Sequence, residues 1–339
     1  MNLKGTVLLL LLIATAASAQ VGGRSTYQFL NLINNPRQAA LGGKVITNYD
    51  YDSTQALFNP SSINWEMDNQ LSVNYSNYLG DVNYGTVSYA YLLDRRTQVF
   101  HTGVTYINYG KFDGYDEQGN ATESFSGGEV ALSFGHARNV AFTNFHVGGN
   151  VKIISSKLEQ YTSLGAAVDL GLFYRYENWD LNITGVVRNI GIQITPYAET
   201  REDLPLEVIL GMSQTLKNVP LRWHFTLENM QQWNVAFANP NRDETDLEGN
   251  STSEKVTFLD NAFRHMIFGI ELFPDSFFNL RLGYNVRRAE ELRIIDTRAF
   301  SGLSAGFAIK LNKLRLSYSY SRYSTAAASS FFGLHIDLR

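Results

Sequence analysis

The clearest chemical motif in the chain is a serine between two glycines, Gly302-Leu303-Ser304-Ala305-Gly306. This Gly-x-Ser-x-Gly pattern is typical of a nucleophile elbow, a sharp strand-to-helix turn that exposes the serine for covalent catalysis. Here the apolar residues around Ser304 continue a strand-like alternation as far as Leu311, so we expect Ser304 to face the inside of a barrel with no helix after it. No paired base is evident, and the sequence therefore indicates that the protein is not an enzyme.

Metal chemistry is not indicated either. The histidines show neither His-Glu-x-x-His nor another close ligand spacing, and rim or lumen positions explain them better. They are His101, His136, His146, His224, His265 and His335. The acidic, glycine-rich stretch from Asp113 to Asn120 could offer oxygen ligands to Ca²⁺, but it lacks the twelve-residue, helix-flanked pattern. A solvated hairpin tip is the better interpretation. We expect no metal and no cofactor.

The composition narrows the class of protein. The 339 residues include no Cys and 27 glycines, and 13% of them are aromatic, a profile that indicates many β-strands and turns with few long helices. The net charge of -4 and the lack of a basic tract argue against a nucleic-acid partner, because phosphates need concentrated Lys and Arg.

The start of the chain predicts export. A basic start from Met1 to Lys4, an apolar core from Val7 to Ile13 and the small residues Ala17-Ser18-Ala19 are typical of a cleaved signal peptide covering residues 1–19. The alternative, an anchoring helix, is disfavoured because the apolar core is well short of the roughly 20 residues that cross a bilayer. No later stretch is apolar enough to cross as a helix, so membrane residence has to come from strands.

Period-two alternation predicts fourteen strands, an even number as bacterial single-chain barrels require. In residues 277–287, for example, apolar side chains alternate with Asn279, Arg281 and Arg287, so one face suits lipid and the other suits water. The last strand should close the barrel against the first and leave no free edge. The expected ranges are 70–79, 83–93, 97–109, 125–137, 143–155, 161–176, 179–190, 204–216, 220–230, 263–274, 277–287, 300–311, 313–323 and 331–338.

A soluble β-sandwich is the alternative, because its strands alternate too. The lengths of the connections favour a barrel, since long and short connections alternate along the chain as outer loops and periplasmic turns do. The long connections are 110–124, 191–203, 231–262 and 288–299, and the short ones include 94–96, 177–178, 217–219, 275–276 and 312. We therefore predict an all-β, transmembrane antiparallel barrel over residues 70–339.

Residues 20–69 precede the first strand and are expected to lie inside the barrel, because a barrel of fourteen strands has more room than its side chains fill. The stretches Ala39 to Gly43, Asp50 to Asp52 and Ala56 to Ser61 resemble the N-terminal hatch of the FadL-like barrels, which also have fourteen strands. Gly42, Gly43, Asn59 and Pro60 would form the hatch motif. The plainer interpretation is a glycine turn followed by an Asn-Pro turn.

More of the chain resembles one branch of that superfamily, the PorQ family of the type IX secretion system. The resemblance is carried by Val21 to Leu32, Asn108 to Asp113 with Asp116 to Asn120, and Leu204 to Glu207. It implies a non-enzymatic outer-membrane barrel of the cell-surface attachment complex. There it would associate with PorZ and, with PorV and the sortase-like PorU, help to anchor cargo to anionic lipopolysaccharide.

A FadL-type transporter, which passes a hydrophobic small molecule through the hatch and a gap in the wall, is the alternative. If a surface protein is held instead, the outer loops are the candidate docking sites. The alternative for the longest of them is a mobile, charged loop. The candidate residues are Asp113, Tyr115, Asp116, Asp243, Glu244, Asp246 and Glu248.

Charges of both signs are predicted inside the barrel, a mixture that suits internal ion pairs and contacts to the plug better than an ion-selective pore, so we expect a closed lumen. They are Lys152, Asp169, Arg175, Arg188, Glu207, Arg222, Glu228, Glu271, Arg281 and Lys310.

Overall fold

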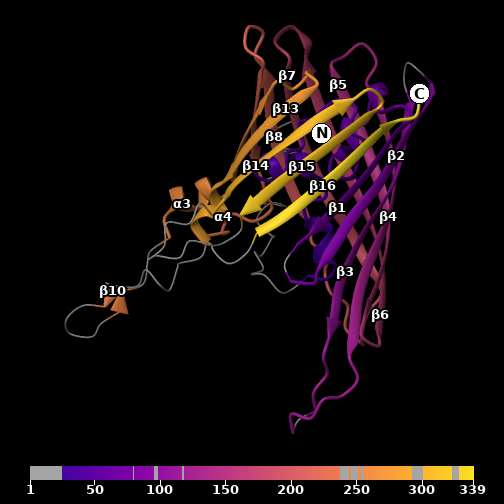
Figure 1. The fold of residues 1–339 in the computed structure, drawn as a ribbon, viewed down its shortest axis with the longest axis vertical. Helices are drawn as coiled ribbons and strands as arrows, with labels where there is room; N and C mark the ends of the chain where they lie inside the picture. Colours follow the sequence, from indigo (N-terminus) through magenta and orange to yellow (C-terminus); the bar gives the residue numbers. More distant parts are fainter. Residues whose placement is uncertain are drawn as a thin grey trace, which may run out of the picture.

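The fold is a closed antiparallel barrel of fourteen strands, as predicted (Figure 1). The computed structural model describes residues 25–78, 80–94, 98–116, 118–236, 244–245, 251–252, 256–291, 301–322 and 328–339. The expected signal peptide lies outside these residues. The barrel strands are β1 (Gln70–Asn77), β2 (Asn83–Asp94), β3 (Gln98–Phe112), β4 (Phe125–Asn139), β5 (Phe145–Leu158), β6 (Tyr161–Tyr176), β7 (Leu181–Thr195), β8 (Glu207–Thr215), β9 (Leu221–Leu227), β12 (Met266–Leu272), β13 (Phe278–Asn285), β14 (Leu303–Leu311), β15 (Leu314–Arg322) and β16 (Ala328–Asp337). A separate small hairpin joins β10 (Glu244–Thr245) to β11 (Ser251–Thr252).

Closure comes from the pairing of the first strand with the last. The register runs from Gln70 opposite Asp337 to Asn77 opposite Ser330, so every residue of β1 has a partner in β16. Outward side chains such as Phe268 and Leu282 are apolar and exposed, while their neighbours in sequence point inward. An apolar outer band on a closed barrel is the architecture of outer-membrane barrels. Among the described residues, no helix is long and apolar enough to cross a membrane.

The barrel has a tall side and a short side. We call β3 to β7, which have 14 to 16 residues each, the tall wall. We call β8, β9, β12 to β16 and β1, with 7 to 10 residues each, the short wall. At about 3.3 Å per residue and a tilt near 40°, the tall wall rises about 15 Å further.

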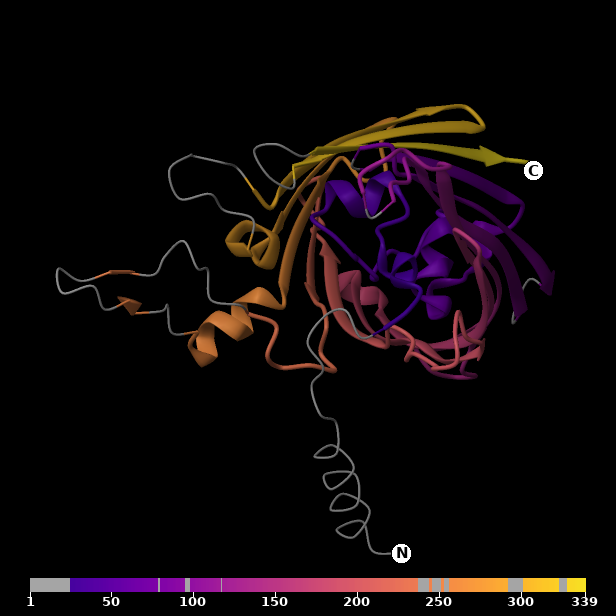
Figure 2. The ribbon, with the colours of Figure 1, turned by 90° about the horizontal axis from the view of Figure 1, so that it is seen from below.

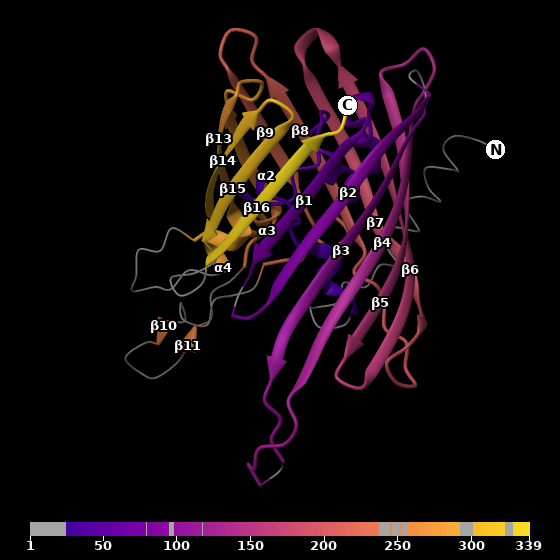
Figure 3. The same cartoon turned by 45° about the vertical axis from the view of Figure 1, so that its right-hand side comes forward.

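The extra height lies on the side of the long connections. Arg188 of β7 is the last residue that pairs with β8, and the strand then continues to Thr195 beyond the end of its neighbour. Long connections face outward in such barrels, so this is the outer side. In Figure 3 the hairpin between β3 and β4 projects furthest at this side.

The hatch, residues 25–69, lies inside the ring of strands when the barrel is viewed from the outer side (Figure 2). Its helices are short, and four of the five begin at a residue whose side chain caps the first turn. Asn35 caps α2, Asp52 caps η2 and Asn59 caps η3 through its bond to the backbone N–H of Ser61. The hatch helices are η1 (Gln28–Asn31), α2 (Pro36–Ala40), η2 (Ser53–Leu57), η3 (Pro60–Ser62) and η4 (Trp65–Met67).

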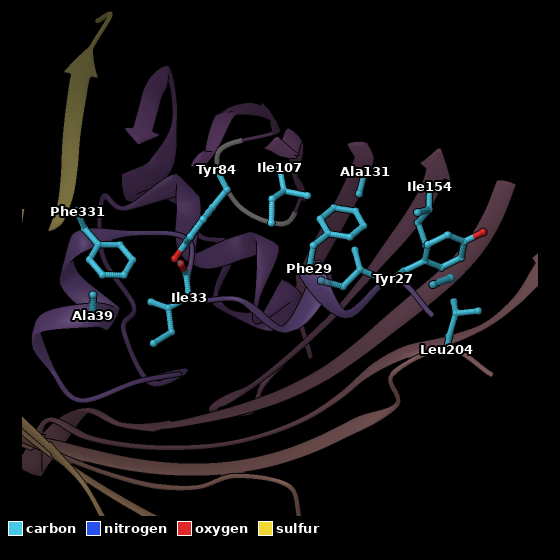
Figure 4. Close-up of a cluster of buried hydrophobic side chains, with 12 residues drawn as sticks. Tyr27, Phe29, Ile33, Ala39, Tyr84, Ile107, Ala131, Ile154, Leu204 and Phe331 are labelled. Carbon is cyan, nitrogen blue, oxygen red and sulfur yellow. Dashed lines mark hydrogen bonds between the residues drawn. The ribbon is translucent and has the colours of Figure 1, made fainter. Parts of the chain in front are cut away.

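An apolar layer joins the first part of the hatch to the outer half of the wall. Tyr27, Phe29 and Leu30 of the hatch pack here against wall side chains that include Tyr84 and Phe331 (Figure 4). All five are at most 6% exposed. The layer therefore fills this part of the lumen with side chains.

Two short helices correct the predicted strand ends. The strand predicted for 277–287 ends at Asn285, and α4 (Val286–Glu291) follows, because the Asn285 side chain accepts a bond from the backbone N–H of Arg288. The strand predicted for 263–274 begins at Met266, after α3 (Phe258–Arg264). A capping box between Thr257 and Asp260 starts α3.

Candidate functional site

The candidate site is the contact between the hatch and the inner face of the barrel. On the short wall, Gly283 lies against the hatch backbone, and a Cβ atom there would stand 2.0 Å from the Gly42 nitrogen. Gly269 and Gly306 make similar room for Leu41 and Ala40. Gly42 itself has a φ of +94°, which favours glycine. Because these wall glycines have no side chain, the hatch turn can lie directly against the backbone of the wall.

The tall wall receives the Asn-Pro turn in the same way. A Cβ atom on Gly148 would stand 2.3 Å from the Pro60 carbonyl oxygen, and one on Gly171 would stand 2.7 Å from the Asn59 side-chain oxygen. The Asn59 amide also donates to the Ile46 carbonyl at 2.8 Å. All four residues of the predicted hatch motif therefore lie in the lumen, and Gly42, Asn59 and Pro60 meet wall glycines.

A buried ion-pair cluster ties the hatch to the short wall. Glu271 of β12 receives Arg37 of the hatch in a bidentate pair, with Nε at 2.7 Å and Nη2 at 2.9 Å. Arg281 of β13 and Arg222 of β9 approach the same carboxylate at 3.1 and 3.4 Å. Arg37 also pairs with Asp50 at 2.7 Å. One wall carboxylate thus organises three guanidinium groups, two of them from the wall.

Electrostatics keep the hatch carboxylate of this cluster ionised. Burial by itself opposes the ionisation of Asp50, but the adjacent Arg37 and Arg222 outweigh it and hold the pKa of Asp50 below its usual range. The cluster therefore carries charge on both sides at neutral pH. A hatch held by paired charges is costly to displace, because each charge would lose its partner inside the protein.

A second cluster lies where the two walls meet. Glu207 at the start of β8 pairs with Lys44 of the hatch and with Arg188 of β7, the latter at 2.8 Å. Arg188 further donates to the Leu30 carbonyl at 2.9 Å and stacks over the Phe58 ring, with its Cζ 4.0 Å from the ring centre. In the tall wall, Lys152 and Asp169 form a pair at 2.7 Å.

Most of the charges predicted inside the barrel are found there. Lys152, Asp169, Arg188, Glu207, Glu228, Glu271 and Arg281 are buried, and Arg175 and Arg222 are partly buried. Lys310 shares the inward face of β14 with Ser304 and Ala308, but it is exposed because it lies near the end of the strand. It lines a depression of about 430 Å³ on the periplasmic side together with Trp65 and Arg315.

The serine of the Gly-x-Ser-x-Gly motif packs against the hatch. Ser304 lies within β14 and its hydroxyl donates to the Ala40 carbonyl at 3.1 Å. The strand continues to Leu311 without a helix, as predicted. Among the described residues, no group of three His, Cys, Asp or Glu side chains is placed to hold a metal ion.

The outer hairpin between β3 and β4 carries three of the candidate docking residues. Asp113, Tyr115 and Asp116 are exposed, and Asp116 closes the tip by accepting from the backbone N–H groups of Gln118 and Asn120. The side chain of Asn120 bonds the same carboxylate, and these bonds lower the pKa of Asp116. This is a hairpin tip of the predicted kind.

The other four candidate docking residues belong to the long connection before α3. Asp243, Asp246 and Glu248 lie outside the described residues, and of Glu244 the structure describes the backbone, in β10.

Two tyrosines pack against the apolar layer and bond a buried carboxylate of the wall. Tyr109 and Tyr197 both donate to the buried carboxylate of Glu129, and Tyr197 also bonds Ser156. Burial raises the pKa of Tyr197, which lies in the connection after β7, to about 12. Its hydroxyl stays protonated and remains a donor at neutral pH.

The sequence analysis expected the inward charges to contact the hatch but did not name their hatch partners. Arg37, Lys44 and Asp50 are charged residues in a segment predicted to lie in the lumen, opposite wall charges that were predicted to point inward. The presence of charged residues in a luminal segment that faces inward wall charges was the signal that could have revealed these pairs. The luminal glycines were missed as well, although Gly269, Gly283 and other glycines occupy inward positions of predicted strands.

Solved structures match the chain in fold, although no protein-family model and no curated protein matches its sequence. Among solved structures it is similar to a FadL homologue from Pseudomonas aeruginosa, with a TM-score of 0.51 and 10% identity over 90% of this chain and 98% of that one. The chain therefore has the fold of a FadL-like barrel.

Two further structures are less similar. CdiB from Acinetobacter baumannii has a TM-score of 0.35 and 10% identity, covering 79% of this chain and 59% of its own. KdgM porin has a TM-score of 0.32 and 6% identity, covering 80% of this chain and 99% of its own. The likeness to these two is too slight to support a conclusion.

Proposed function

We propose that this FadL-like barrel is a non-enzymatic outer-membrane platform that holds a surface protein on its outer side. The observation that carries the proposal is the tight fit of the hatch. The wall meets the hatch backbone at Gly283 and Gly148, and Arg37 and Lys44 anchor it through buried carboxylates. A plug held at backbone distance and by paired charges suits a closed support better than a path for solutes.

The sequence resemblance supplies the proposed system. We propose a component of the type IX secretion system of the PorQ kind, holding a PorZ-like protein in the attachment complex, together with PorU and PorV and near lipopolysaccharide. Several described residues of the resembling stretches build the plug, since Phe29 and Leu30 fill the apolar layer and Glu207 pairs with Lys44. These contacts support an architecture shared with that family, whereas the proposed identity of the partner comes from the sequence resemblance alone.

The proposed absence of catalysis has its own support. Ser304 is the residue of the Gly-x-Ser-x-Gly motif that could take part in covalent chemistry. Its hydroxyl donates a hydrogen bond to the Ala40 carbonyl of the hatch. Its place near the start of β14, buried and followed by strand as far as Leu311, differs from the exposed strand-to-helix turn that a nucleophile elbow needs.

Transport of a hydrophobic small molecule is the second candidate. The fold shared with a FadL homologue favours it, and so does the apolar layer between hatch and wall around Tyr27 and Phe29. A transporter should bind an apolar molecule between hatch and wall.

Purification from the native outer membrane in mild detergent tests the two functions against each other. We expect mass spectrometry of the tagged barrel to recover a PorZ-like surface protein, with or without PorU and PorV. Recovery of the barrel alone with a bound lipid or other apolar molecule would favour transport.

Planar-bilayer recordings test the closed lumen by an independent route. Because the hatch fills the barrel and is fixed by ion pairs, we expect no large, stable single-channel conductance. Such a conductance in the purified wild-type protein would contradict a closed platform.

A further inference from the structure

The tall wall exposes apolar side chains on its inner face, above the plug. Phe112 and Phe125 are 45% and 39% exposed, and Leu158 and Tyr161 are 37% and 48% exposed. They lie at the outer ends of β3, β4, β5 and β6. We call these four residues the vestibule face.

The direction of these side chains follows from their neighbours. Alternate residues of a strand share a face, and the next inward positions below Leu158 and Tyr161 are Ser156 and Ser163. Both serines are buried and bond luminal tyrosines, Ser156 with Tyr197 and Ser163 with Tyr27. Leu158 and Tyr161 therefore point to the inner side of the wall.

The same reasoning places the two phenylalanines. Phe125 shares its face with Gly127 and with the buried Glu129. A Cβ atom on Gly127 would lie 3.0 Å from the Leu158 side chain, so Leu158 borders this position. Phe112 pairs with Phe125 across the strands, and their rings stack with centres 5.4 Å apart. The four side chains form one surface.

This surface faces away from lipid. Side chains such as Val130 and Leu164 occupy the opposite, outward face of the same strands. The apolar layer below is already filled by hatch side chains, including Phe29. Large apolar side chains grouped on a water-facing surface mark an interaction site.

The connections around the vestibule face are acidic. Their described, exposed residues include seven acidic side chains against three basic ones on the same strand ends and connections. The acidic residues are Asp113, Asp116, Glu123, Glu159, Glu199, Glu202 and Asp203, and the basic ones are Lys111, Lys157 and Arg201. A net negative rim attracts a basic protein surface and repels a fatty-acid carboxylate.

We propose that the vestibule face is the docking site of the surface protein, which places apolar side chains on it and surrounds them with Lys and Arg. This inference rests on the proposed platform function and assigns the contact to the tall wall. The apolar centre supplies the affinity, and the acidic rim supplies orientation and the rate of association. Docking here lies above the plug and leaves the hatch in place.

A pair of matched double variants tests the site. Phe125→Asp with Leu158→Asp puts two carboxylates on the vestibule face, while Ser126→Asp with Thr162→Asp puts two on the outward face at the same height. Heat-modifiable mobility in gels verifies that each barrel is folded. We expect the vestibule variant to retain at least about tenfold less PorZ-like protein than wild type, and the control to retain as much as wild type.

The outcomes separate this inference from the function beneath it. If wild type and the vestibule variant retain the PorZ-like protein equally, the site is wrong and the platform function stands. If wild type retains no such protein, the platform function fails, and the docking site fails with it. A fatty acid that co-purifies with wild type and is lost from the vestibule variant would overturn the protein-docking assignment in favour of a ligand site.

Salt provides a second readout on the wild-type complex. Because the rim is net acidic, we expect retention to fall as NaCl rises from low concentration to about 0.5 M, where exposed charges are screened. Retention that is insensitive to salt, or that rises with it, would contradict a basic partner surface.

Discussion

The tall and short walls belong to one sheet but differ in what they contact. The short wall meets the hatch through Glu271, which Arg281 of the wall also pairs with, and through the glycines around Ala40 to Gly42. The tall wall also seats the hatch, at Gly148 and Gly171, but it then continues outward for about another 15 Å. Its added length carries the vestibule face and the projecting hairpin. Strand length thus separates a part that fixes the plug from a part that reaches beyond the membrane.

The difference teaches how such a barrel can gain an outer surface while its lumen stays closed. The short strands, of 7 to 10 residues, carry the charged cluster, whose Glu271, Arg281 and Arg37 are buried in the lumen. In the tall wall the inward face changes character along each strand, from buried polar residues such as Ser156 to the exposed apolar Leu158. The change occurs at the point where the hatch ends.

The largest expected effect comes from the charged cluster of the short wall. Glu271→Gln should lower the free energy of unfolding by about 3–5 kcal/mol, because Arg37 and Arg281 lose their common partner inside the protein. Asp169→Asn in the tall wall should cost less, since in the described part of the chain Asp169 forms one ion pair, with Lys152, and its bond from the Asn189 backbone N–H can be kept by the amide oxygen. Urea titrations of the barrel in lipid vesicles measure both.

A substitution in a more exposed ion pair serves as the control for the Glu271→Gln result. Arg287→Gln removes an ion pair with Glu291 that is about a quarter to a third exposed, and it should change stability by about 0–1 kcal/mol. If Asp169→Asn costs as much as Glu271→Gln, the charged anchorage is not specific to the short wall.

The next largest loss of stability is expected from adding a side chain at a glycine that contacts the hatch. Two adjacent residues of β5 test this. Gly148→Ala directs a methyl group at the Pro60 carbonyl and should destabilise the barrel by about 1–3 kcal/mol. Gly149→Ala meets its nearest atom at 3.6 Å, an ordinary contact, and should be close to neutral. Equal values from the same urea titration would show that the hatch yields at this point.

Partner retention then separates the two walls on the outer side. Deleting residues 241–255, in the long connection of the short wall, should leave retention of the PorZ-like protein unchanged. Deleting residues 115–121, at the tip of the tall-wall hairpin, should reduce it because acidic rim residues are lost. The opposite pattern, measured by the same co-purification, would place docking on the short wall.

The smallest effect concerns the order of that hairpin tip. The folded loop lowers the pKa of Asp116, so the carboxylate bonds to Gln118 and Asn120 support the tip fully above about pH 4, the ordinary aspartate value. This support is lost as the pH falls through the lowered pKa. Asp116→Ala should therefore speed proteolysis within residues 112–125 at neutral pH, with barrel stability unchanged. Unchanged cleavage would mean that the bonds do not order the tip.

Much of the barrel was predictable from local pattern. All fourteen strands were found at the predicted places, with some ends shifted, because one face of each strand has to suit lipid where it crosses the membrane. Ser304 points inward for the same reason. The helix after Asn285 was missed, since Val286 and Arg287 continue the alternation while a side-chain cap turns the backbone into a helix.

The general location of the candidate site was predictable from the sequence, but its individual contacts were not. A luminal segment and inward charges were both predicted, yet nothing in the order of residues pairs Arg37 with Glu271, which is 234 positions away.

Local patterning was enough to place the strands, their faces and their number, because period-two alternation is a local property that every lipid-facing strand must satisfy. Tertiary structure alone decided which hatch residue meets which wall residue. It also decided that Leu158 stays exposed while Ser156, two positions away, is buried. The physical reason is that closure of the barrel brings distant segments together and fixes the depth to which the hatch fills it.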